Sequence, residues 1–139
     1  MISQISLSGE IFDALYKAKE NEDREFESAE NWLTDIIENA DREKRESCEI
    51  CDSCKQLEVH HVRGRKFGNE VITACGQCHK TLTNNQKLRD KSWLDSNSEN
   101  KNSFLKLGFI DICNLKFDKT GIEIYKRFAE KLTEGFSYD

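Results

Sequence analysis

Two Cys-x2-Cys pairs constrain the fold of this chain more than any other feature. The first pair is Cys48 and Cys51, the second is Cys75 and Cys78, and 23 residues separate them. Each pair can form a tight turn that presents both sulfur atoms to one point, so the four thiolates can close a tetrahedral shell around a metal ion. The spacing therefore predicts a structural Zn²⁺ site inside residues 47–91.

Two further cysteines leave the ligand set open. Cys54 lies three residues after Cys51 and forms an equally spaced pair with it. We prefer Cys48 with Cys51, because this choice leaves a longer connection to the next strand. Cys113 stands in an apolar stretch and is interpreted as an ordinary buried thiol. Disulfides are not expected, since the N-terminus lacks the basic start and apolar stretch of a secretory signal. We expect an intracellular, cytoplasmic protein with no membrane partner.

The rest of the chain predicts a mostly helical α+β fold. Apolar side chains recur at three- and four-residue spacings near both ends, and the absence of proline lets long helices run without interruption. Two short, partly β-branched segments in the middle predict strands. The predicted elements are one or two helices over 8–46 divided at 19–24, strands at 57–62 and 71–74, a helix over 80–91, a polar connector at 94–103, a helix over 104–117 and a last helix from 121.

Three segments follow from this pattern, within one compact domain. They are an N-terminal helical segment at 1–46, a zinc-binding ββα unit at 47–91, and a connector with a C-terminal helical pair at 92–139. The net charge of the chain is −5, but residues 55–91 carry 8 basic and 3 acidic side chains while residues 1–54 carry 6 basic and 15 acidic ones. Because local potential decides where a phosphate binds, the central unit can contact a polyanion.

All three histidines of the chain fall inside the predicted zinc unit. His60 and His61 end the first predicted strand, and His79 follows Cys78 directly. Chance placement of all three within some 20 residues of 139 is improbable. We therefore assign the histidines a shared role. Alternation along a strand sends His60 and His61 to opposite faces while the strand stays regular.

The cysteine pairs and histidines together resemble the HNH endonuclease family, in its four-cysteine zinc-containing branch. The stretches that carry this resemblance are Cys48–Cys51, Leu57–Val62 and Cys75–His79, and the likeness covers about residues 48–85. The resemblance implies a zinc-stapled ββα-metal unit and a metal-dependent hydrolase of phosphodiester bonds. DNA is the expected substrate, and RNA is an open alternative.

The resemblance also implies roles for the histidines. It makes His61 the general base that deprotonates the attacking water, because a neutral imidazole can accept a proton near neutral pH. It makes His60 and His79 ligands of a catalytic divalent ion, distinct from the structural zinc. This ion is Mg²⁺, Mn²⁺ or Ni²⁺, and nitrogen ligation tilts the choice away from Mg²⁺.

One position departs from the family pattern. Where the family has an asparagine five residues before the second cysteine pair, this chain has Glu70, and Asn69 lies one place earlier. Asn69 can orient the base through a shifted turn, or Glu70 can accept the other N–H of His61. A degenerate, inactive site is the third alternative.

Basic side chains surround the histidines in the sequence and are candidates for phosphate contact. The predicted nucleic-acid contacts are Arg63, Arg65, Lys66, Lys80 and Lys87. Gln86, between them, is a candidate for reading base edges in a groove.

The sequence is compatible with two other functions. The first is a catalytically inactive HNH-like zinc module that binds nucleic acid. The second is a regulatory protein that binds a protein partner through the acidic helices of 1–46. The helical flanks can also support a homodimer, which double-strand cleavage would require because one ββα unit has one site.

Overall fold

The computed structural model describes residues 7–19, 25–39, 42–62, 69–87 and 98–134 of the chain. The elements are α1 (Leu7–Ala18), α2 (Phe26–Glu38), β1 (Glu58–His61), β2 (Val71–Ala74), α3 (Gly76–Lys87), α4 (Ser98–Thr120) and α5 (Glu123–Glu134). The prediction of a mostly helical α+β fold is confirmed, and the two strands pair as a small antiparallel sheet. Within these residues, no helix combines the length and the apolar character needed to cross a membrane.

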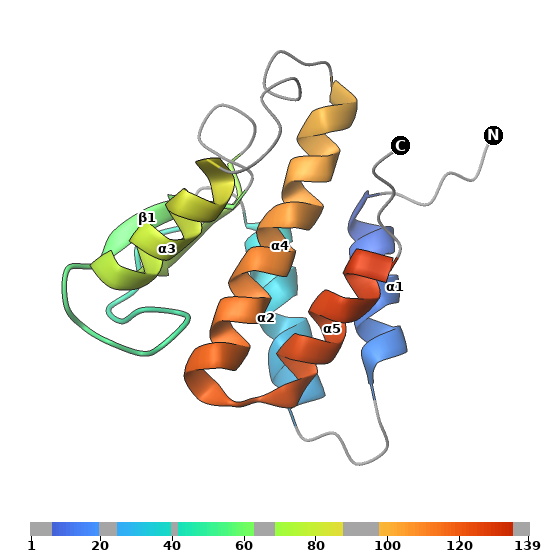
Figure 1. The fold of residues 1–139 in the computed structure, drawn as a ribbon, viewed down its shortest axis with the longest axis horizontal. Helices are drawn as coiled ribbons and strands as arrows, with labels where there is room; N and C mark the ends of the chain where they lie inside the picture. Colours follow the sequence, from blue (N-terminus) through green and yellow to red (C-terminus); the bar gives the residue numbers. More distant parts are fainter. Residues whose placement is uncertain (1–6, 20–24, 40–41, 63–68, 88–97, 135–139) are drawn as a thin grey trace.

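Four helices build the larger part of the core. α4 packs along α5, α5 also packs on α1, and α2 contacts both α1 and α5 (Figure 1). The side chains at the centre of this packing are fully buried, and burial of such a side chain stabilises a fold by about 1.5–3 kcal/mol. They include Ile11, Leu15, Leu33, Ile36, Phe109, Ile112 and Phe128.

A glycine turn folds α5 back along α4. Gly121 has a φ of +73°, a left-handed conformation that side chains with a Cβ adopt only with strain. The Gly121 N–H donates to the Phe117 carbonyl at 2.7 Å, so the residue ends α4 as a left-handed cap. This turn brings the apolar stripe of α5 onto the buried face of α4.

The two strands and α3 form a ββα unit beside α4. β1 and β2 are antiparallel, with His60 opposite Ile72 and His61 opposite Val71. Because side chains alternate along a strand, His60 and His61 lie on opposite faces of this sheet. α3 contacts both strands and also contacts α4 (Figure 1).

The N-terminal helical region is divided as predicted, but it ends earlier. α2 stops at Glu38, and the described residues 42–46 are not helical, so the predicted continuation to residue 46 is wrong. The reason is tertiary contact with β2. The Arg42 guanidinium donates to the Val71 carbonyl at 3.0 Å, and the Arg45 N–H donates to Thr73 Oγ1 at 2.8 Å.

Two later helices begin earlier than predicted. α3 starts at Gly76 instead of residue 80, because the His79 N–H already donates to the Cys75 carbonyl at 2.8 Å. The second cysteine pair is therefore part of a helix start. α4 starts at Ser98, so the C-terminal half of the predicted connector at 94–103 is helical.

Gly108 sets the closest approach of α4 to the end of β1. A Cβ on Gly108 would lie 2.1 Å from the Val62 carbonyl oxygen. Because this oxygen is a backbone atom, it cannot move aside as the end of a flexible side chain could. We expect Gly108→Ala to lower the free energy of unfolding by about 1–3 kcal/mol, although alanine is the better helix former. Thermal unfolding measures this, with Asn114→Ala on the exposed side of α4 as the control. Equal stability of both variants would contradict the close packing.

Candidate functional site

The structure brings the four predicted zinc cysteines together. Cys48 and Cys51 come from the turn before β1, Cys75 directly follows β2, and Cys78 lies in the first turn of α3. Their four sulfur atoms lie within 4.8 Å of one another. A two-stranded sheet and a helix start thus position two sequence-distant pairs around one point.

The distances between these sulfur atoms fit a tetrahedral metal site. Cys51 Sγ lies 3.7 Å from Cys75 Sγ and 3.8 Å from Cys78 Sγ. Four sulfur atoms at the usual Zn–S distance of about 2.3 Å lie about 3.8 Å apart. All four residues are free thiols, so no disulfide competes for the site. The chain therefore has a four-cysteine site that can hold a structural metal such as zinc.

The backbone around the first pair supports ligand geometry. The N–H groups of Ile50 and Cys51 point at Cys48 Sγ, at 3.4 and 3.5 Å. Asp52 adopts a left-handed φ of 67°, and its N–H donates to the Cys48 carbonyl at 2.9 Å. Backbone donors aimed at a sulfur atom stabilise its thiolate form, which is the form that binds metals.

The thiol of Cys75 has a lowered pKa within the four-cysteine cluster. Burial raises the pKa of Cys75, but hydrogen bonds from the Cys78 backbone and from neighbouring thiols outweigh burial and lower this pKa to about 7. Burial raises the pKa of Cys78 instead. Cysteine binds a metal as the thiolate, so a cation bound at the cluster would favour the deprotonated form of its ligands.

The remaining cysteines take no part in this site. Cys54 is exposed and lies outside the four-sulfur cluster, so the alternative pairing with Cys51 is not adopted. Cys113 is fully buried in α4, and burial raises the pKa of its thiol above the ordinary value. The interpretation of Cys113 as a buried core thiol is confirmed.

Glu49, between the first two cysteines, fastens the cysteine turn to the rest of the fold. Its carboxylate accepts two bonds from the Arg42 guanidinium, at 3.2 and 2.5 Å. The same carboxylate accepts the Trp32 indole N–H at 3.1 Å and the Thr73 backbone N–H at 2.6 Å. The Arg42 side chain is 4% exposed and also pairs with Asp35 at 2.8 Å. The turn that carries Cys48 and Cys51 is thus connected to α2 and β2 by one largely buried network of charged side chains.

Replacement of this carboxylate tests the network. In Glu49→Gln, an amide NH₂ would face the donors of Arg42 or Thr73, and the buried guanidinium would lose its main counter-charge. We expect the free energy of unfolding to fall by about 1.5–3 kcal/mol. Chemical denaturation measures this fall against Glu46→Gln, a nearby exposed position. A loss no larger than that of Glu46→Gln would show that the network adds no stability.

A lysine of α4 places positive charge beside the same turn. Lys116 Nζ donates to the Glu49 carbonyl at 2.5 Å and lies 4.0 Å from the centroid of the Trp32 ring. Burial lowers the pKa of Lys116, while the nearby Cys113, Glu49 and Cys48 act in the opposite direction. A zinc ion with four thiolates carries net negative charge, so this ammonium would offset part of it.

Two of the three histidines lie against each other. His60 comes from β1 and is 2% exposed, and His79 comes from the first turn of α3. Their ring centroids are 5.5 Å apart and the rings are nearly perpendicular. His61 lies on the other face of β1 and is half-buried. The sheet register thus separates the histidine proposed as base from the two proposed as ligands.

Asn69 and Glu70 lie next to the end of β1. The Val62 N–H donates to the Glu70 carbonyl at 2.9 Å, which continues the ladder one pair beyond His61 opposite Val71. Asn69 is exposed and Glu70 is half-buried. Both candidates for orienting His61 therefore sit at the correct strand end.

Two polar side chains, Glu58 and Gln86, make contacts next to the histidines that were not predicted from the sequence. Glu58 Oε2 lies 3.4 Å from His79 Nδ1. Gln86 does not point outward as a base-reading residue would; its amide nitrogen donates to the His61 carbonyl at 2.9 Å. The spacing of seven residues between His79 and Gln86 puts both on one face of α3, and this signal is visible in the sequence.

The predicted phosphate contacts are only partly described. Lys80 and Lys87 are exposed on α3, seven residues apart and so on one helix face. α3 contains no acidic residue. Arg63, Arg65 and Lys66 lie outside the described residues.

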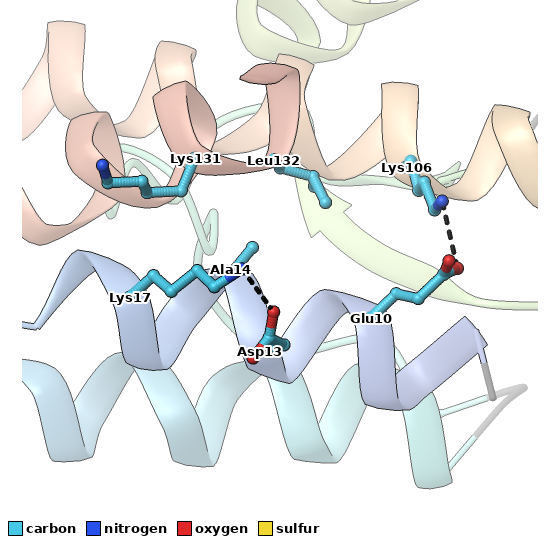
Figure 2. A pocket seen from close by; sticks show the side chains of 7 residues that line it. All are labelled: Glu10, Asp13, Ala14, Lys17, Lys106, Lys131 and Leu132. Atoms are coloured by element: carbon cyan, nitrogen blue, oxygen red, sulfur yellow. Dashed lines mark ion pairs between the residues drawn. The ribbon is translucent and has the colours of Figure 1, made fainter. Parts of the chain in front are cut away.

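A separate pocket lies among the helices, away from the cysteines and histidines (Figure 2). It has a volume of about 230 Å³ between α1, α4 and α5. Lys17 pairs with Asp13 at 2.9 Å, and Lys106 pairs with Glu10 at 3.0 Å. Two of its three lysines are thus held by acidic residues that line the same pocket, and the pocket contributes no group to the four-cysteine site.

Comparison of the chain with known protein families, with curated proteins and with solved structures gave no match. The functional assignment therefore rests on the cysteines, the histidines and their geometry.

Proposed function

We propose that this protein is a metal-dependent endonuclease of the HNH type, which hydrolyses phosphodiester bonds in DNA. The observation that carries the proposal is the pairing of His60 with His79, whose ring centroids lie 5.5 Å apart next to the four-cysteine site. The order of strand, strand and helix around these residues agrees with the family that the sequence resembles.

The spacing of the two imidazoles suits a shared metal ion. With metal–nitrogen distances of about 2.1 Å, two imidazoles on one ion have ring centroids roughly 4.5–6 Å apart. His60 and His79 would hold the divalent ion, and Mn²⁺ or Ni²⁺ suits nitrogen ligands better than Mg²⁺. When bound, the ion would polarise the phosphate and stabilise the leaving 3′ oxygen.

His61 would act as the general base. It ends β1 on the face opposite His60 and is partly exposed, so water can reach its ring. A neutral imidazole would take the proton of the attacking water as the new P–O bond forms. Asn69 or Glu70, at the adjoining strand start, would orient His61 through its second ring nitrogen.

The surface charge around the unit supports a nucleic-acid substrate. Lys80 and Lys87 are exposed on a helix without acidic residues, while the N-terminal segment is strongly acidic. Binding would therefore weaken steeply as salt concentration rises.

The experiment that tests the proposal is incubation of supercoiled plasmid with the zinc-loaded protein and Mg²⁺, Mn²⁺, Ni²⁺ or Co²⁺ in turn. Nicked or linear product that depends on the added ion supports the proposal. A non-catalytic nucleic-acid module is the second candidate. It is favoured by one observation: among the described residues, no third His, Cys, Asp or Glu joins His60 and His79 as a metal-binding group. Salt-sensitive DNA binding with no cleavage under any ion would establish that module instead.

A further inference from the structure

Each of the two paired histidines has a polar side chain against one ring nitrogen. Gln86 Nε2 lies 3.4 Å from His60 Nε2, and Glu58 Oε2 lies 3.4 Å from His79 Nδ1. Strand alternation puts Glu58 and His60 on one face of β1, and helical spacing puts His79 and Gln86 on one face of α3. Four side chains of two elements thus form one polar cluster.

Two backbone carbonyls fix the orientation of the Gln86 amide. Its nitrogen lies 2.9 Å from the His61 carbonyl oxygen and 3.4 Å from that of Val62. Carbonyl oxygens only accept hydrogen bonds, and a flipped amide would place its own oxygen against both. The amide NH₂ has two protons: one bonds to the His61 carbonyl at 2.9 Å, and the other is shared between the Val62 carbonyl and His60 Nε2, both at 3.4 Å. His60 Nε2 therefore faces an N–H donor and acts as the acceptor, which puts the proton of a neutral His60 ring on Nδ1.

In the second histidine, a hydrogen-bond acceptor sets which ring nitrogen carries the proton. His79 Nδ1 faces the Glu58 carboxylate, which when ionised only accepts. Nδ1 of His79 therefore carries the proton, and its lone pair sits on Nε2. Metal-binding histidines commonly donate their other ring N–H to a carboxylate in this way.

We propose that Gln86 and Glu58 are positioning residues that set His60 and His79 in the same tautomer, so that both rings offer the Nε2 lone pair to one divalent ion. The half of this statement that concerns the ion rests on the proposed function. A bound ion would take the place of the Gln86 N–H at His60 Nε2, and Gln86 would keep its bond to the His61 carbonyl. Gln86 thereby also holds the strand end that carries the base.

The test reads the tautomers directly, without any assay of cleavage. Long-range ¹H–¹⁵N spectra of the ¹⁵N-labelled, zinc-loaded protein, recorded at about pH 8 and so above the ordinary imidazole pKa of about 6.5, distinguish Nδ1–H from Nε2–H rings. The chain has three histidines, so His61→Ala and His79→Gln suffice to assign the signals. We expect the Nδ1–H pattern for both His60 and His79.

Variants separate the two positioning residues. Gln86→Leu should remove the pure Nδ1–H pattern of His60 and leave His79 unchanged, while Glu58→Ala should do the reverse. Glu58→Gln keeps an oxygen acceptor and should restore the His79 pattern. Zinc content and melting temperature, measured in parallel, confirm that each variant is folded.

Binding of Mn²⁺ to the zinc-loaded protein, followed by the loss of the free-ion signal in electron paramagnetic resonance, gives the second readout. Glu58→Ala should weaken Mn²⁺ binding about 10- to 100-fold, and Glu58→Gln should recover most of the loss. The Nε2–H tautomer at either histidine of the parent protein overturns the inference, whether or not DNA is cut. The expected tautomers and Mn²⁺ binding without cleavage would support the inference and count against the nuclease alone.

Discussion

Removal of the metal from the four-cysteine site is expected to unfold the ββα unit. A structural zinc ion supplies an apparent binding free energy of about 10–16 kcal/mol in small zinc-dependent units. Without it, the unit has two strands of four residues each, and an isolated two-stranded sheet is marginal in water. Residues 58–61, 71–74 and 76–87 should therefore lose protection from amide hydrogen exchange on chelation.

A cysteine variant gives the same result without a chelator. Cys75→Ser removes one thiolate from the cluster and should lower both the zinc content and the melting temperature. Cys54→Ser is the matched control, because Cys54 is exposed and outside the cluster, and it should behave as the parent. Because the ligands must be deprotonated, acid should release the metal as well. Zinc well below one equivalent in the parent, or melting that chelation leaves unchanged, would contradict a structural zinc site.

His61→Ala is expected to remove most of the cleavage activity while the fold stays intact. A positioned general base contributes about 100- to 10,000-fold to the rate, so kcat should fall by that factor. KM should change little, because the base acts in the chemical step and not in substrate binding. Single-turnover cleavage of a labelled duplex measures the rate constant.

Structural measurements keep this result interpretable. His61 is half-buried and is outside the four-sulfur cluster, so His61→Ala should retain its zinc and melt near the parent temperature. An unchanged rate in the folded, zinc-loaded variant would remove His61 from the mechanism. A raised KM with an unchanged kcat would instead indicate a binding residue.

The metal site was predictable because its signal is local. Each cysteine pair is a short turn, and the choice of Cys48 over Cys54 followed from the length of chain needed before β1. The strands were predictable for a related reason, since β2 occupies the predicted residues 71–74 and β1 lies within 57–62. Turn geometry and β-branched runs depend on few distant contacts.

Helix ends were less predictable because distant residues decide them. The apolar spacing predicts a helix to residue 46. It contains no information on the hydrogen bonds from Arg42 to the Val71 carbonyl and from the Arg45 N–H to Thr73 Oγ1, which join residues 28 to 29 positions apart. The same holds for Glu49, whose carboxylate accepts hydrogen bonds from residues of a helix, a loop and a strand. Nothing in the sequence indicates that the Glu49 side chain is only 11% exposed.

Around the histidines, too, some contacts are predictable from local spacing and others depend on the tertiary structure. The pairing of His60 with His79 follows from spacing and from the resemblance, whereas the contact of Glu58 with His79 needs the strand register and the helix placement together. Gln86 is misread from sequence because an amide near lysines also suits DNA contact. Only the position of two carbonyls shows that it faces the strand.

We propose that the ββα unit hydrolyses phosphodiester bonds with a divalent ion distinct from the one that the four cysteines can hold. The most direct measurement is end-group analysis of a short labelled DNA duplex incubated with zinc-loaded protein, with and without Mn²⁺. We expect cleavage only when Mn²⁺ is added, with 5′-phosphate and 3′-hydroxyl ends, because the 3′ oxygen is the leaving group. An intact duplex, together with intact single-stranded DNA and RNA under every divalent ion tested, would contradict it.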